Sequence, residues 1–318
     1  MTTSALDHRL VRARRGGVLK KLLVVLAILV VLVPMALVLA IDPIAKAGIA
    51  AAGSHALGVK TRVAEASIGV TSGKTAVRGL EVDNPEGYSP EKFVLLREIA
   101  VDAGVGDFLG DKIEIHRVAI TGLTIEIEKG ADGKLNVERI SENIRKVTGA
   151  GGEKPAEPTG ESKEAVIHEL RLEQVQVNLR NLVDGKDGMV EVKLPDLVIR
   201  ELSSKGGVDV LASELSGVVI GSAMKAVIAA NIEGLGSDVL GGMQGAVEGI
   251  GAAIGGALRG AVDEGLKGAG EALKDVGKQL GDVGAKAVED AGKMLEGAGD
   301  KVKEGVGGAL EGIFGGKK

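Results

Sequence analysis

Residues 113–127 read IEIHRVAITGLTIEI, in which apolar and polar side chains alternate. The apolar side chains form three groups: Ile113 and Ile115, then Val118 and Ile120, then Leu123, Ile125 and Ile127. Strict alternation is typical of a β-strand with one buried face. The phase slips by one residue between groups, which in a straight strand would turn the apolar set to the other face. We therefore predict bulges or sharp bends near Arg117 and Gly122.

The same slipped pattern returns 52 residues later, where residues 165–179 read AVIHELRLEQVQVNL. The pair Ile115-His116 matches Ile167-His168, and the turn signal Asp132-Gly133-Lys134 matches Asp184-Gly185-Lys186. Two copies of one strand–bend–strand–turn unit are expected to stack side by side and extend a sheet. Between them lie a predicted amphipathic helix (137–147) and a polar Gly/Pro linker (149–164).

An uncharged apolar run occupies residues 22–41 (LLVVLAILVVLVPMALVLAI). At about 1.5 Å per residue it spans roughly 30 Å, the thickness of a bilayer core. A cleaved signal peptide is the alternative, but its apolar region is normally only about 7–15 residues long. The basic flank before the run predicts an uncleaved single-pass anchor with a cytoplasmic N-terminus and an exported body.

The C-terminal part is rich in Gly and Ala, with fourteen glycines between Gly260 and Gly312. Each glycine costs a helix about 1 kcal/mol relative to Ala, so a lone helix here needs an apolar partner. The sheet, a second copy of the chain and a lipid surface are the alternatives. GxxxG spacing at Gly241, Gly245 and Gly249 suits close helix packing and self-association. Residues 235–314 either extend as one helix of about 120 Å or fold back and cap the groove.

These patterns divide the chain into four parts: a cytoplasmic basic tail (1–21), the anchor (22–41), an exported β-rich body (42–210) and a Gly/Ala-rich helical segment (211–318).

Composition and motifs point away from enzymatic chemistry. The net charge is −5, which gives no general attraction to nucleic acid, and the chain has no Cys. Residues 69–75 (GVTSGKT) have one residue too few between the glycines for a phosphate loop and are predicted to be a strand-connecting turn. His116 and His168 lack further converging metal ligands. We expect no catalytic residues, no cofactor and no metal.

The ordered motifs of residues 59–140 resemble the N-terminal region of the AsmA-like proteins of the bacterial envelope. The motifs are Gly79-Leu80-Glu81-Val82, Asn84-Pro85-Glu86-Gly87-Tyr88-Ser89-Pro90, Phe108-Leu109-Gly110, Ile113-Glu114-Ile115 and Asp132-Gly133-Lys134-Leu135-Asn136. The resemblance implies an α+β protein with a curved antiparallel sheet, open on one side, whose aliphatic inner face forms a groove. It also implies kinship to bridge-like lipid transfer proteins, phospholipid transport and outer-membrane maintenance. About ten strands would make a groove only about 50 Å long, too short to bridge two membranes.

The candidate groove-lining residues are Ile99, Val101, Ile125, Ile127, Val175 and Val177. Glu126 and Asn178 are expected on the opposite, polar face, where they should tolerate Lys. The leading hypothesis is lipid handling or envelope maintenance, with membrane lipid and an envelope protein as partners. The alternative is a non-catalytic structural or interaction scaffold. An apolar channel open to solvent favours the first hypothesis, and a groove filled by the chain itself favours the second.

Overall fold

A computed structural model describes residues 40–69, 72–108, 112–149, 164–184, 188–204 and 208–281. The chain divides into two compact units, Met1–Ile44 and Ala45–Lys318. The described part of the first unit, residues 40–44, is helical. The predicted anchor at 22–41 lies outside the described residues except for its last two positions.

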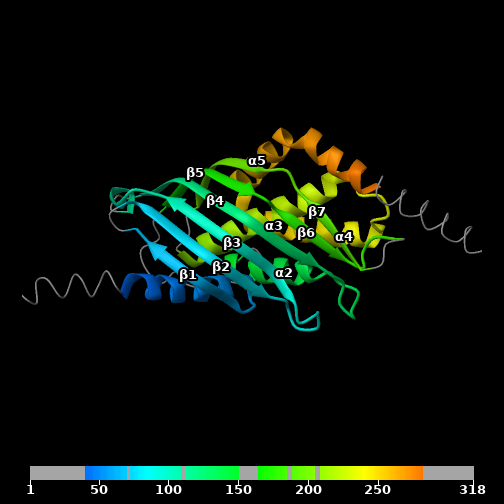
Figure 1. Ribbon diagram of the computed structural model, residues 1–318, viewed down its shortest axis with the longest axis horizontal. Coiled ribbons are helices and arrows are strands. Elements are labelled where there is room, and N and C mark those ends of the chain that lie inside the picture. The colour runs from blue at the N-terminus through cyan, green and yellow to red at the C-terminus, as the bar shows by residue number, and fades with distance from the viewer. Residues whose placement is uncertain are drawn as a thin grey trace, which may run out of the picture. The chain divides into compact units, whose positions relative to one another are not determined.

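The second unit is an α+β structure built on a curved, unclosed sheet of eight strands (Figure 1). The strands are β1 (Thr61–Ile68), β2 (Lys74–Asp83), β3 (Lys92–Asp102), β4 (Lys112–Ile127), β5 (Glu164–Glu173), β6 (Gln176–Arg180), β7 (Met189–Lys193) and β8 (Leu197–Ser204). They lie in the order β1-β2-β3-β4-β5-β8, and β6 joins the far end of β4 and pairs with β7. A short 3₁₀ turn, η1 (Val105–Phe108), precedes β4.

The sheet is mixed, so the expected all-antiparallel sheet is wrong. Strands β1 to β4 are antiparallel to their neighbours, but β4 runs parallel to both β5 and β6. The partners of Ile115 and Ile125 are Ile167 and Val177, each 52 residues further along the chain. The two repeat copies therefore lie side by side in register. Two copies joined by a long crossover that returns to the same end of the sheet must be parallel.

Local bends keep the apolar side chains of β4 on one face, as predicted. Gly122 has a φ of +72°, and the equivalent residue of the second copy, Gln174, has a φ of 54° and separates β5 from β6. Near the earlier slip, His116 and Arg117 are consecutive exposed residues. Because of these irregularities, all buried aliphatic side chains of β4 lie on one face. They are Ile115, Val118, Ile120, Leu123, Ile125 and Ile127, whereas Ile113 is only half-buried.

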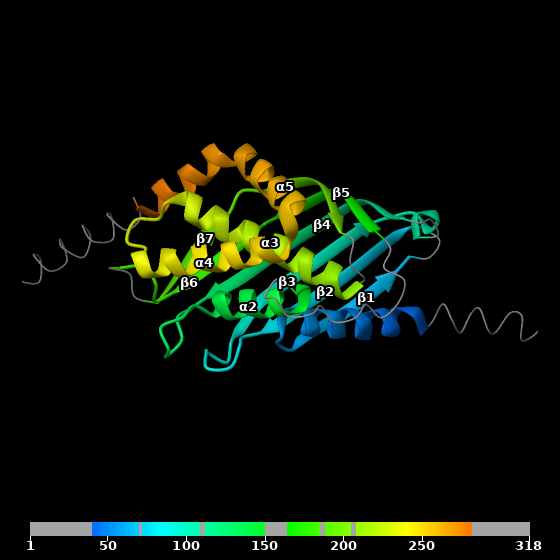
Figure 2. The ribbon, with the colours of Figure 1, turned by 180° about the vertical axis from the view of Figure 1, so that it is seen from behind.

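Helices cover one face of the sheet (Figure 2). They are α2 (Asn136–Thr148), α3 (Val208–Ala230), α4 (Ser237–Ala253) and α5 (Gly255–Gly268), with further helical residues at 45–57 and 270–281. The predicted amphipathic helix at 137–147 is confirmed as α2, which buries Val137, Ile140 and Ile144. The Gly/Ala-rich segment folds back onto the sheet as several helices, at least as far as residue 281.

Glycines permit the close packing of these helices. A Cβ on Gly217 of α3 would lie 2.7 Å from Cγ2 of Ile254, and one on Gly249 of α4 would lie 2.4 Å from Oγ of Ser141 in α2. A Cβ on Gly265 of α5 would lie 2.8 Å from the backbone carbonyl oxygen of Val198 in β8. By contrast, Gly241 and Gly245 face open space in the described structure. Of the predicted GxxxG motif, Gly249 therefore packs against another helix, whereas Gly241 and Gly245 lie on an open face.

Candidate functional site

The six predicted groove-lining residues lie on the helix-covered face of the sheet. Ile125, Ile127 and Val177 are fully buried, and Val175 is 2% exposed. Ile99 and Val101 are partly buried and pack against the same hydrophobic core. The structure therefore places all six on one face of the sheet, four of them as core residues and Ile99 and Val101 as partly buried residues packed against the core.

The aliphatic face is closed by the chain's own helices. Val218, Met224 and Val227 of α3 and Met243 of α4 are fully buried in one cluster with the strand residues. Within the described part of the chain, the expected groove open to solvent is replaced by this filled core. Gly/Ala-rich helices can fill it because glycine allows their backbones to approach closely.

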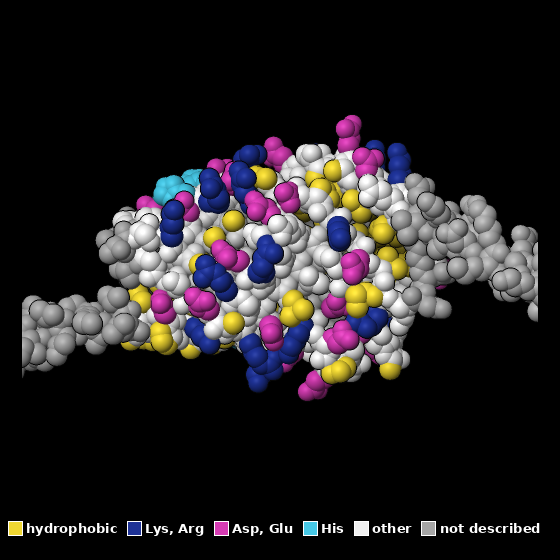
Figure 3. Space-filling model, viewed as in Figure 1, with side chains coloured by type: hydrophobic (Ala, Val, Ile, Leu, Met, Phe, Trp, Pro, Cys, Tyr) yellow, Lys and Arg dark blue, Asp and Glu magenta, His cyan; other side chains and the backbone are white. Residues whose placement is uncertain are grey.

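The opposite face of the sheet carries charged side chains of both signs (Figure 3). Arg78 of β2 lies 3.4 Å from Glu65 of β1 and 3.1 Å from Glu98 of β3. Arg117 of β4 lies 3.1 Å from Glu169 of β5. Arg171 donates to the same Glu169 carboxylate and is the main cause that lowers its pKa. The charges on this outer face largely pair across strands and leave no extended basic surface.

One end of the outer face is buried beneath the loop that follows β2. We call Asn84, Glu126, Glu128, Asn136, Asn178 and Arg180 the polar cluster. Glu128 accepts hydrogen bonds from Nδ2 of Asn84 (2.7 Å) and from the backbone N–H of Ser89 (2.8 Å). The fully buried Asn136 donates to Oδ1 of Asn84 (2.9 Å) and to the carbonyl of Glu126 (2.8 Å). These bonds fasten the Asn84–Pro90 motif to the start of α2.

The polar cluster corrects one expectation about the outer face. Glu126 and Asn178 do point away from the core, but they are only 8% and 5% exposed. Asn178 donates a hydrogen bond to Glu126, and Arg180 lies 3.4 Å from the same carboxylate. A Lys at either position would break a buried network, so the expected tolerance to Lys is wrong. Alternation places a side chain on a face but does not reveal which loop covers it.

His116 and His168 meet at the opposite end of the outer face, with ring centroids 6.4 Å apart (Figure 3). His168 lies 3.3 Å from Glu201 and 3.5 Å from Glu114, and these carboxylates raise its pKa. His116 lies 3.5 Å from Asp107. Among the described residues, no group of three or more His, Asp and Glu side chains is placed to hold a metal ion.

The phosphate-loop-like stretch forms the turn between β1 and β2, as predicted. The backbone N–H of Gly69 donates to the carbonyl of Lys74 at 2.9 Å, and that of Gly73 donates to the carbonyl of Gly69 at 2.8 Å. Residues 70 and 71 lie outside the described chain, as do residues 185–187 of the second Asp-Gly turn.

Sequence patterns did not single out several polar groups in the helical layer. Ser222 of α3 is fully buried and has no hydrogen-bond partner among the described residues. Burial raises the pKa of Glu214, also in α3. A cavity of about 180 Å³ lies between α3, α4 and α5, with Arg259 beside it. In the sequence, Ser222 and Glu214 stand out only as polar residues within an apolar helix. That pattern alone does not distinguish a functional site from a structural position.

One helical stretch within the described residues, Leu211–Ala230, is long and apolar enough to cross a membrane. Core helices meet the same criterion, and most of this stretch is buried against the rest of the unit. No family model matches the chain, and neither does a curated protein or a solved structure.

Proposed function

We propose that this chain is a non-catalytic, inner-membrane-anchored envelope protein whose periplasmic body serves as an interaction scaffold. The closed aliphatic face carries the proposal. Ile125 and Val177 would be central to an acyl-binding groove, yet both are fully buried in the core formed by the sheet and its own helices. A sheet whose apolar face is already covered is suited to presenting its other surfaces.

The membrane location rests on the sequence. The uncharged run at 22–41 is long enough to span a bilayer, and the basic residues before it favour a cytoplasmic N-terminus. The resemblance to AsmA-like proteins supports a role in envelope maintenance.

The outer face is the surface that the scaffold offers to protein partners. Its paired charges can re-pair with charges on another protein, which favours specificity over raw affinity. Leu95 of β3 stands among them with 44% of its surface exposed, and Met189 of β7 is 43% exposed. In an interface with an apolar centre and a polar rim, Leu95 would supply an apolar contact among the charges.

Photo-crosslinking in cells tests the scaffold. A photoreactive amino acid at Leu95 is expected to capture a protein, whereas one at Ile125 or Val177 is expected to yield only crosslinks within the chain, to α3 or α4. Glu114, exposed on the same sheet face beside the histidines, provides a comparison site away from Leu95. Protein adducts from Leu95 no more frequent than those from Glu114 would contradict the assignment of the surface.

Lipid handling is the second candidate, and one feature of α3 favours it. The stretch Leu211–Ala230 is long and apolar enough to cross a membrane, so in this hypothesis the helix acts as a lid that leaves the sheet and exposes the aliphatic face. The same crosslinking experiment separates the candidates. Lipid adducts at Ile125 and Val177, absent at the outward-facing Glu98, would establish the lid and refute a permanently closed scaffold.

A further inference from the structure

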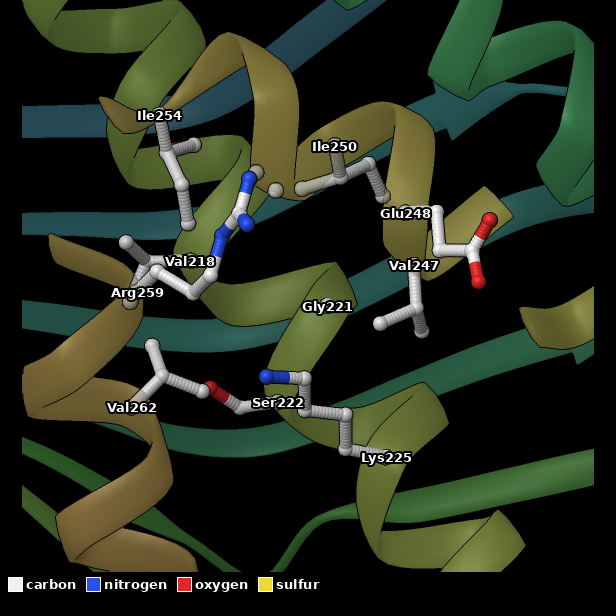
Figure 4. Close-up of a pocket in the computed structure, with 12 residues that line it drawn as sticks. Val218, Gly221, Ser222, Lys225, Val247, Glu248, Ile250, Ile254, Arg259 and Val262 are labelled. Carbon is white, nitrogen blue, oxygen red and sulfur yellow. The ribbon is translucent and has the colours of Figure 1, made fainter. Parts of the chain in front are cut away.

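The helical layer contains a cavity that is lined by residues of α3, α4 and α5 and by none of the sheet. This cavity, about 180 Å³ in volume and partly open to solvent, lies where α3, α4 and α5 meet (Figure 4). Its apolar walls come from five aliphatic side chains: Val218, Val247, Ile250, Ile254 and Val262. A cavity of about 150 Å³ with aliphatic and aromatic walls is known to admit a molecule the size of benzene. This cavity therefore has room for an aliphatic group of about six non-hydrogen atoms.

Two polar side chains at the cavity have no partner among the described residues. Ser222 lines it, is fully buried and has no hydrogen-bond partner for Oγ among the described residues. Leaving a buried hydroxyl unpaired is unfavourable, so an acceptor bound in the cavity would recover the lost interaction. Arg259 at the start of α5 is exposed, and its guanidinium lies over Gly251, where a Cβ would be 3.1–3.3 Å from its atoms.

The other charges at the cavity leave Arg259 as its available cation. Lys225 of α3 forms an ion pair with Asp263 at 2.6 Å. Glu248 of α4 also lines the cavity, but its carboxylate points away from Arg259 (Figure 4). No carboxylate of the described chain lies within ion-pair distance of Arg259.

We propose that this cavity binds an aliphatic monocarboxylate of about six carbons, held at its carboxylate by Arg259 and Ser222. The guanidinium offers two N–H donors in the geometry that a carboxylate accepts, and Ser222 supplies a further O–H donor. The alkyl chain packs against the aliphatic walls and gains burial without displacing any side chain. The site lies in the helical layer, so the proposal does not depend on the scaffold function or on an open groove.

The test uses the full chain in nanodiscs of zwitterionic phospholipid, with a photoreactive hexanoate that carries a diazirine near its methyl end. Labelled peptides identified by mass spectrometry are expected to contain the lining residues of α3, α4 and α5. Unlabelled hexanoate is expected to compete at least about ten-fold better than hexanol, and hexylammonium not to compete, because one charge-assisted interaction is worth about this factor.

Two variants and a control assign the contacts. Arg259→Gln is expected to weaken labelling about ten-fold and Ser222→Ala about three-fold, whereas Lys267→Gln, an exposed lysine of α5 that does not line the cavity, should leave it unchanged. Arg259 is exposed, so its replacement should preserve the fold, which thermal melting would verify. Equal competition by hexanol, unchanged labelling of Arg259→Gln, or labels only on other peptides would each overturn the proposal.

Discussion

The two faces of the sheet are built from the same strands but are stabilised in different ways. Towards the helices, Ile125 and its neighbours lie in a continuous aliphatic core from which water is excluded. Towards solvent, residues such as Arg78 and Glu98 form ion pairs that remain partly exposed. Burying an aliphatic side chain is worth about 1.5–3 kcal/mol, whereas an exposed ion pair contributes about 0–1 kcal/mol. The stability of the unit is therefore concentrated on the face that the helices cover.

The largest contrast between the faces is expected at adjacent positions of β4. Ile125→Asp should lower the free energy of unfolding by about 4 kcal/mol or more, because it places an unpaired charge in the core. Its repeat partner, Val177→Asp, should behave alike. Denaturant unfolding of the full chain in nanodiscs measures the effect.

Thr124→Asp provides the control, because Thr124 is half-buried and points to the outer face. We expect a loss of about 1 kcal/mol or less. Equal losses from Thr124→Asp and Ile125→Asp would show that the assignment of faces is wrong.

At the polar cluster, substitutions on the outer face should also be strongly destabilising, because this part of the outer face is buried. Asn136→Ala should cost about 2–3 kcal/mol because it leaves the partners of Asn136, including Asn84, unpaired within the protein. Glu142→Ala, on the exposed side of the same helix, should cost less than about 0.5 kcal/mol. A small effect of Asn136→Ala would mean that water replaces the lost bonds.

The bend at Gly122 keeps the apolar side chains of β4 on one face. Its contribution to the free energy of unfolding can be measured by substitution. Gly122→Ala should cost about 1–2 kcal/mol, because its φ of +72° is unfavourable for any residue with a Cβ and because Cβ of Arg97 lies only 3.0 Å from the added methyl group. Gln174→Gly, at the equivalent bend of the second copy, should change stability by under about 1 kcal/mol, since relief of its φ of 54° offsets the lost hydrogen bond from Arg97. Equal losses from both variants would argue against a shared bend.

The smallest effect should come from the histidines of the outer face. Glu201 and Glu114 raise the pKa of His168 above its unfolded value of about 6.5, so protonated His168 favours the folded state. This contribution is fully present below about pH 6.5 and is lost as the pH rises through the raised pKa. The stability difference between the wild type and His168→Gln should therefore be larger at about pH 5.5 than at about pH 8.5. A difference that grows with pH would reverse the sign, and the exposure of His168 keeps the effect small.

Local patterns in the sequence predicted much of the sheet but not what covers it. The repeat, the bend at Gly122 and the amphipathic helix α2 follow from spacing, because strand and helix periods are local properties. The parallel orientation of the copies does not, since it depends on the path of the crossover between Ile127 and Glu164. The filling of the groove by α3 and α4 is equally non-local, because apolar Gly/Ala-rich helices suit a sheet, a second copy or a lipid surface.

The pairing of the two repeat copies also bears on how the chain folds. Strands β1 to β4 pair with their neighbours in sequence, so short loops close each contact, whereas β5 meets β4 only across 52 residues. Pairing over such a separation is slow, which favours the four-strand meander as the first part of the sheet to assemble. The chain between β4 and β5, which includes α2 and the polar Gly/Pro stretch at 149–164, is the loop that must then close. Doubling that loop would cost only about 0.6 kcal/mol, so longer linkers are expected to delay refolding while leaving the finished sheet almost as stable.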